Sequence, residues 1–188
     1  MTPELTHALI RTIRGWGEPG EGPDLVLTNR PNDYHRDHRY TAQAVLDASY
    51  VLTVPTLCPE VPHLRRMPIF AYWSDRFREG GAFRPDVVIP IDAALEIKAS
   101  IGLQHESQIF EWLPYNAGRL DEVPAGAADR RRYVLERLRA RGAAVLARPG
   151  TREALGPAAA TTTAAEAFQI SEYGRQPSEA ELRALFPL

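Results

Sequence analysis

Cysteine and long apolar runs are both scarce in this sequence. Cys58 is the only cysteine, so no disulfide can form within the chain, and a single thiol fits a reducing compartment. No window reaches the roughly 18 consecutive apolar residues that a membrane-spanning helix needs. The first residues also lack the basic region that begins a signal peptide. We therefore expect a cytoplasmic protein with no membrane partner.

An excess of charge of one sign is absent as well. The 188 residues include 22 Lys and Arg against 24 Asp and Glu, which gives a net charge of −2. This balance gives no electrostatic reason to expect nucleic acid as a partner. Hydrophobic residues make up 44% of the chain, which is ordinary for a globular protein that buries a core. The length suits one domain, so we expect a single domain over residues 1–188.

The first half of the sequence contains helical patterns that alternate with short apolar runs. Apolar residues recur at helical spacing over residues 4–14 and predict a helix there. The apolar run 25–27, bounded by turn residues, predicts a buried strand of the kind found in parallel sheets. Asp37 can cap a helix that follows that strand. Two further apolar runs, 69–73 and 87–89, predict two more strands.

The second half is predicted to be mostly helical. One helix is expected from Asp92 to Gly102, with Ala94, Ile97 and Ile101 facing inward, and another near residues 129–147. Ser178 and Glu181 have the spacing of a capping box and predict a last short helix.

Alternation of strands with helices predicts the fold class. We expect an α/β domain with a Rossmann-like, largely parallel sheet flanked by helices. Residues 157–165 are rich in Ala and Thr, and we expect a linker or flexible loop there.

The segment after the first predicted strand has the greatest density of chemically capable side chains. Asp33, His35, Asp37 and His38 lie within six residues, just past the carboxyl end of the strand. Ligands bind at that end in open α/β sheets, and imidazole is a ligand for Zn²⁺ or a proton donor. Structural roles are also open, because Asp37 suits a helix N-cap and Asp33 suits a turn. Two histidines alone cannot hold a catalytic zinc, which needs about three protein ligands.

Tyr34-His35-Arg36-Asp37-His38 resembles the second motif of the PIG-L (LmbE-like) zinc-dependent N-deacetylases, which usually reads His-Pro-Asp-His. Arg36 stands where that family has proline, at a position expected to face away from the metal. Further blocks that match the family follow in its order: Ala71 to Asp75, His105 to Gln108, and Ala165 to Gly174.

The resemblance implies roles for individual residues. His38 would be a zinc ligand, His35 would stabilise the tetrahedral intermediate and protonate the amine, and Asp37 would orient His35. The expected substrate contacts are Asp33, Tyr34, His105 and Gln108. The implied reaction is hydrolysis of an N-acetyl group of an amino sugar or glycoside, with Zn²⁺ as the cofactor that activates water.

The motif that this family carries after its first strand, Ala-His-Pro-Asp-Asp, does not occur in the sequence. That motif supplies two zinc ligands and the general base, so the resemblance implies the C-terminal portion of a deacetylase domain, with an incomplete zinc site and impaired activity. One alternative is a non-catalytic remnant or subunit that needs a partner chain, and a homo-oligomer is one such arrangement. Another is a sugar- or nucleotide-binding α/β module without hydrolysis, although no glycine-rich phosphate-binding motif is present.

Overall fold

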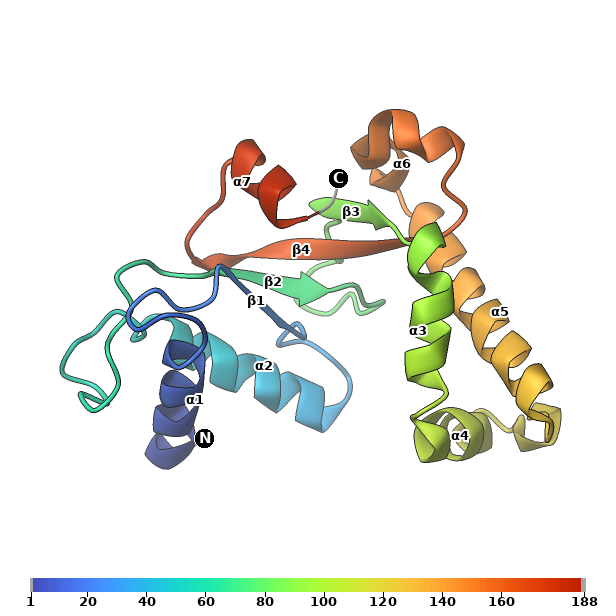
Figure 1. Cartoon of the computed structure of the whole chain (residues 1–188), viewed down its shortest axis with the longest axis horizontal. Helices are drawn as coiled ribbons and strands as arrows, with labels where there is room; N and C mark the ends of the chain where they lie inside the picture. Colours follow the sequence, from blue (N-terminus) through green and yellow to red (C-terminus); the bar gives the residue numbers. More distant parts are fainter. Residues whose placement is uncertain (1, 187–188) are drawn as a thin grey trace. The chain divides into compact units, whose positions relative to one another are not determined.

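A computed structural model describes residues 2–186, and in that range the chain forms an α/β fold around a four-stranded mixed sheet (Figure 1). The strands are β1 (Leu25–Thr28), β2 (Ile69–Trp73), β3 (Val87–Pro90) and β4 (Ala165–Gly174). Their order in the sheet is β1-β2-β4-β3. β1 runs parallel to β2, whereas β4 runs antiparallel to β2.

The sheet confirms part of the architecture expected from the sequence. Strands occur at all three predicted apolar runs, and β1 forms the expected parallel pair with β2. The expectation of a largely parallel sheet does not extend to β4, because this strand is antiparallel to β2. Apolar residues alternate along a strand in the same way whichever direction it runs, so the pattern alone does not encode its orientation.

The described chain divides into two compact units. The first unit takes residues 2–87 and 167–186, and the second takes residues 88–166. Each unit is described below by itself. Within residues 2–186, no helix combines the length and the apolar character needed to cross a membrane.

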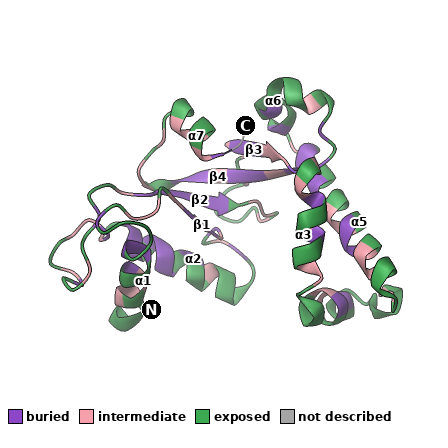
Figure 2. Ribbon diagram, in the orientation of Figure 1, coloured by how far each residue is buried: buried purple, intermediate pink, exposed green. Residues whose placement is uncertain are grey.

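In the first unit, helices pack against both faces of the strands. These helices are α1 (Pro3–Arg14), α2 (Arg36–Ser49) and α7 (Glu179–Leu185). Ile10 of α1, Val45 of α2 and Phe70 of β2 belong to one buried cluster. On the opposite face, the ring of Phe168 in β4 lies 5.3 Å from that of Phe186, just after α7. Figure 2 shows that β2 and the first part of β4 are largely buried, as this two-sided packing requires.

The helix N-termini test the predicted caps. Thr2 caps α1 through its hydroxyl oxygen. Ser178 with Glu181 forms the complete capping box of α7, which confirms the prediction for that helix. The prediction for α2 is wrong. Its cap is His35, whose Nδ1 accepts a hydrogen bond from the backbone N–H of Asp37, and Asp37 is the second residue of the helix.

Arg14 holds the long loop that follows α2. The side chain is buried, and its guanidinium donates hydrogen bonds to six backbone carbonyls, those of Val51, Leu52, Val54, Leu57, Cys58 and Val61. A guanidinium presents five N–H donors in a rigid fork, so one residue can bind several carbonyls of the same loop. The loop that follows α2 is thereby fixed to α1 inside the first unit.

The second unit is helical apart from its strand segments. Its elements are η1 (Asp92–Ala94), α3 (Leu95–Gly102), the π-helical η2 (Ser107–Trp112), α4 (Leu113–Asn116), η3 (Leu120–Glu122), α5 (Ala127–Leu146), α6 (Thr151–Leu155) and η4 (Gly156–Ala160). Leu95, Ala99, Phe110, Val134 and Leu135 lie in one buried cluster. α5 confirms the predicted helix near 129–147, and it buries Val134 and Leu135 in this cluster.

Of the inward face predicted for the helix after Asp92, Ala94 packs against this cluster, but the prediction is wrong for Ile97 and Ile101. Ile97 and Ile101 are 65% and 57% exposed, and Leu95 with Ala99 faces the core instead. The helix begins as the 3₁₀ turn η1 and continues as an α-helix. A 3₁₀ turn has about 3.0 residues per turn and the α-helix 3.6, so the change rotates later residues away from the phase of a uniform helix.

Residues 157–165, expected to be a linker or flexible loop, contain η4 and the first residue of β4. Thr162 and Ala164 in this segment are buried. Asp92 accepts a hydrogen bond from the backbone N–H of Thr163 at 3.1 Å and another from its hydroxyl. The hydroxyl contact is the main cause of a pKa of Asp92 below its usual value. A carboxylate therefore holds the middle of this segment.

Candidate functional site

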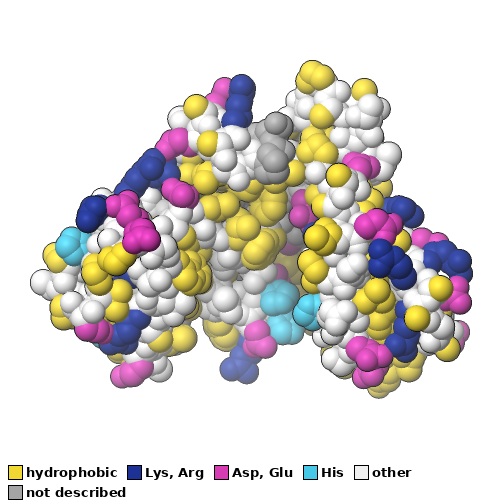
Figure 3. Space-filling view, in the orientation of Figure 1, with side chains coloured by type: hydrophobic (Ala, Val, Ile, Leu, Met, Phe, Trp, Pro, Cys, Tyr) yellow, Lys and Arg dark blue, Asp and Glu magenta, His cyan; other side chains and the backbone are white. Residues whose placement is uncertain are grey.

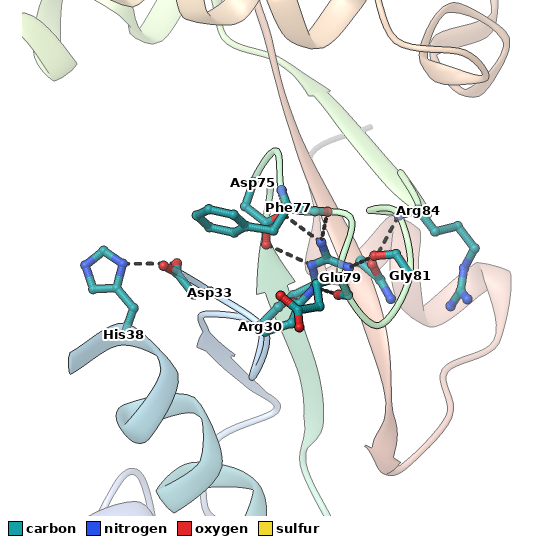
Figure 4. Close-up of polar contacts among 10 residues, drawn as sticks. Arg30, Asp33, His38, Asp75, Phe77, Glu79, Gly81 and Arg84 are labelled. Carbon is teal, nitrogen blue, oxygen red and sulfur yellow. Dashed lines mark hydrogen bonds and ion pairs between the residues drawn. The ribbon is translucent and has the colours of Figure 1, made fainter. Parts of the chain in front are cut away.

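A carboxylate and two imidazoles meet in the loop between β1 and α2. The buried Asp33 uses both oxygens: Oδ1 accepts a hydrogen bond from the backbone N–H of His35 at 2.7 Å, and Oδ2 lies 3.1 Å from Nδ1 of His38. The backbone carbonyl of Asp33 accepts a hydrogen bond from Arg39 at 2.8 Å. Asp33 thus holds both histidines and is itself held by the first turn of α2 (Figure 4 shows the contact with His38).

The two imidazoles are close together and open to solvent. The ring centroids of His35 and His38 are 4.7 Å apart, with the planes tilted by 38°. The side chain of His38 is 52% exposed, whereas that of Asp33 is only 9% exposed. Figure 3 shows histidine side chains at the molecular surface. The carboxylate is therefore buried behind the rings, and the rings remain accessible to a ligand.

A buried ion pair anchors this loop to the segment that follows β2. Arg30 donates two parallel hydrogen bonds to Asp75, at 2.8 Å from Nε and 2.7 Å from an Nη atom. The same guanidinium donates to the carbonyls of Phe77 at 2.7 Å and Gly81 at 2.9 Å (Figure 4). The carbonyl of Arg30 accepts a hydrogen bond from the backbone N–H of Asp33 at 3.2 Å. The anchor therefore continues directly into the residue that holds the histidines.

The structure brings together Asp33, His35 and His38 from the predicted site. Asp37 lies beside His35, but the contact between them is made by the backbone N–H of Asp37, and the carboxylate that meets an imidazole is that of Asp33. Tyr34 lies next to these residues in the sequence, and its ring is 85% exposed.

His105 and Gln108 belong to the second unit. His105 comes three residues after α3, and Gln108 is the second residue of η2; both side chains are exposed. Short π-helical segments occur often at functional sites, and the segment is otherwise held by Phe110 in the core. Their contribution to a substrate site stays a prediction.

Sequence reasoning missed the roles of Arg30 and Asp75. An arginine in a loop gives no local sign of its partner 45 residues away.

Tyr72, near the end of β2, is buried, and its hydroxyl lies 2.8 Å from that of Ser171. Burial raises the pKa of Tyr72, so its hydroxyl stays neutral.

The described residues do not form a complete metal site. Within residues 2–186, no group of three or more His, Cys, Asp or Glu side chains is arranged to hold a metal ion. Zn²⁺ in a catalytic site takes about three protein ligands, so His35 and His38 do not by themselves fit that ion. In the same range, Thr28 Oγ1 and Asn32 Oδ1 are buried without a hydrogen-bond partner. Unpartnered buried oxygens are rare in folded proteins, and these two lie at the end of β1 and in the loop after it.

The fold of the chain is similar to that of two solved structures. GalB, the 4-carboxy-2-hydroxymuconate hydratase from Pseudomonas putida, aligns with a TM-score of 0.55 and 16% identity, over 95% of this chain and 62% of its own. An N,N′-diacetylchitobiose deacetylase from Pyrococcus horikoshii aligns with a TM-score of 0.50 and 15% identity, over 89% of this chain and 49% of its own. The chain therefore spans less than two thirds of either neighbour.

Both neighbours have LmbE/PIG-L-like folds, which is the fold that the sequence resemblance implies. No protein-family model and no curated protein matches the chain. At identities of 15–16% the likeness concerns the fold, and the two neighbours carry different activities on it.

Proposed function

We propose that this chain provides the histidine-bearing part of a hydrolase that removes an N-acetyl group from an amino sugar or glycoside. The observation that carries the proposal is the pair of exposed imidazoles, His35 and His38, held by the buried Asp33 at the carboxyl end of β1. That end of an open α/β sheet is where ligands bind. The fold shared with a diacetylchitobiose deacetylase, together with the His-x-x-His motif, supports deacetylation over other hydrolytic reactions.

Amide hydrolysis gives the two imidazoles distinct tasks. The reaction needs a donor for the oxyanion that develops on the carbonyl and a proton for the departing amine. His35 is exposed, lies 4.7 Å from the ring of His38, and is the group that we assign to these tasks. His38 is the one metal ligand that we assign to this chain. The zinc ion implied by the resemblance would need its remaining ligands from outside residues 2–186.

A non-catalytic subunit that completes its site with a partner chain is the second candidate. It is favoured by the incomplete ligand set, because within residues 2–186 no three His, Cys, Asp or Glu side chains are arranged to hold a metal ion. On this alternative the chain has the same histidine pair but takes no part in hydrolysis, even when a second polypeptide completes the sheet. The two candidates differ in whether acetate is released once the site is complete.

Zinc titration of the purified full chain tests the metal assignment. The variant His38→Ala should weaken zinc binding by about tenfold or more, since removing even a residue behind a ligand costs about 10- to 100-fold in affinity. The matched control is His63→Ala, which removes an exposed histidine from the loop between α2 and β2 and should leave the affinity unchanged. Equal affinity of the wild type and His38→Ala would remove the assignment.

Acetate release from N,N′-diacetylchitobiose, measured with zinc present, tests the reaction. With an incomplete metal site, we expect the chain alone to show little or no turnover. Rapid turnover would support the hydrolase but contradict the incomplete site, and it should then fall in His35→Ala. No acetate release in the presence of any completing polypeptide would leave only the non-catalytic alternative.

A further inference from the structure

We infer that the loop sets opposite tautomers on the two imidazoles, so that Nε2 of His38 is an unprotonated acceptor while Nε2 of His35 carries a proton. This inference adds detail to the proposed function. It rests on that function only for the tasks assigned to the two rings. The tautomers themselves follow from the hydrogen bonds that each ring makes through Nδ1.

His38 faces a carboxylate. Its Nδ1 lies 3.1 Å from Oδ2 of Asp33, and an ionised carboxylate can only accept a hydrogen bond. The neutral imidazole must therefore carry its proton on Nδ1, which leaves the lone pair on Nε2. This is the same arrangement by which a carboxylate fixes the tautomer of a metal-binding histidine. With a half-exposed side chain, His38 presents that lone pair to a ligand.

His35 faces a donor instead. Its Nδ1 accepts a hydrogen bond of 3.3 Å from the backbone N–H of Asp37, and a backbone N–H can only donate. Nδ1 of His35 is therefore unprotonated, and the proton of the neutral ring lies on Nε2. This arrangement differs from the one that the resemblance implies, in which the carboxylate of Asp37 orients His35.

The two tautomers have a common cause in the backbone of the loop. Asp33 accepts the backbone N–H of His35 through Oδ1, which places His35 as the N-cap of α2 and brings its ring over the first helical N–H groups. One helical turn later His38 returns to the other oxygen of the same carboxylate. Asp33 is thus a positioning residue for both rings. The result is an Nε2 donor on one ring and an Nε2 acceptor on the neighbouring ring, which matches the different tasks assigned to His35 and His38.

Nitrogen-15 NMR of the full chain reads the tautomers directly, because protonated and unprotonated ring nitrogens resonate in well-separated ranges. The spectra are recorded at increasing pH until the ring signals no longer change, so that only the neutral rings are compared. We expect the signal of a protonated Nδ1 for His38 and of a protonated Nε2 for His35. A proton on Nε2 of His38, or on Nδ1 of His35, would overturn the inference.

Two variants separate positioning from simple structural support. In Asp33→Ala the majority tautomer of His38 should invert to the Nε2–H form that free histidine favours in water, and Asp33→Asn, whose amide oxygen can still accept from Nδ1, should retain part of the Nδ1–H form. In Asp37→Asn both rings should keep their tautomers, because the hydrogen bond to His35 comes from the backbone. A change of the His35 tautomer in Asp37→Asn would contradict us.

The wild-type spectrum and that of Asp37→Asn decide the question even if Asp33→Ala does not fold. The readout needs neither metal nor substrate. Wrong tautomers would therefore refute this inference without touching the proposed reaction, and unchanged zinc binding in His38→Ala would refute the ligand assignment without touching the tautomers.

Discussion

The ion pair between Arg30 and Asp75 should have the largest coupling energy of the interactions that hold the loop of the candidate site. The side chains are only 6% and 12% exposed, and their two hydrogen bonds of 2.7 and 2.8 Å are bidentate. Two unit charges about 4 Å apart interact by about 4 kcal/mol at an effective dielectric constant of about 20. Removing one partner of such a buried pair costs about 3–5 kcal/mol, because the other charge is left without compensation.

A double-mutant cycle measures this coupling. We expect Arg30→Met and Asp75→Asn each to lower the free energy of unfolding, and the double variant to cost about 2–4 kcal/mol less than the sum of the single changes. The assay is urea denaturation of the full chain, followed by tryptophan fluorescence. If Arg30→Met does not fold, Arg30→Lys replaces it, since lysine keeps the charge but loses the planar fork.

A second cycle on an exposed ion pair of the same unit provides the control. Arg11 in α1 pairs with Glu60, and their side chains are 46% and 52% exposed. Solvent screens such pairs, and their coupling is typically about 0–1 kcal/mol. Couplings of equal size in the two cycles would refute the reasoning, because burial and bidentate geometry would then have made no difference.

Two further predictions concern the rest of the first unit. Arg14→Met removes the donor of six carbonyl contacts, so we expect a loss of about 3–5 kcal/mol in the free energy of unfolding; a loss no larger than that of the exposed Arg11→Met would contradict this. The backbone N–H and hydroxyl of Ser178 lower the pKa of Glu181 to about 2 from its usual 4.5. A depressed carboxyl pKa stabilises the fold above 4.5 and loses that contribution as the pH falls from 4.5 toward 2. The thermal midpoint of wild type should therefore fall more steeply across this window than that of Glu181→Gln, and parallel profiles would refute the assignment.

Local patterns predicted the elements whose causes are local. The caps at Thr2 and Ser178 were predictable because a cap needs only residues within one helical turn. The buried runs at β1 and β2 were predictable because a short apolar segment between turns has few other solutions. The exposed face of α3 was not predictable, because the 3₁₀ turn before it is set by contacts such as that between Asp92 and Thr163, 71 residues away. The direction of β4 was not predictable for the same reason, since it depends on the strand with which β4 pairs.

In the candidate site, too, the sequence predicted what depends on neighbouring residues and missed what depends on distant contacts. The sequence placed Asp33, His35, Asp37 and His38 together, because residues within six positions after a strand cannot lie far apart. It could not say which carboxylate meets which ring, since both aspartates lie within a few residues of both histidines. That choice depends on the conformation of the turn from Arg30 to Asp33, which is fixed by contacts with residues 75–81.

The position of the Arg30–Asp75 ion pair affects how an incomplete site could still bind a completing group. Arg30, Asp75, Asp33 and both histidines all lie in the first unit, so the rings are oriented before any completing group arrives. A group that binds to preorganised side chains does not bear the entropic cost of ordering them, and its affinity is higher for that reason. If the Arg30–Asp75 ion pair is what orders the rings, Arg30→Met should leave both tautomers of His38 populated, even though Arg30 touches neither ring. A sharp, unchanged His38 signal in that variant would mean that Asp33 and the first turn of α2 are sufficient on their own.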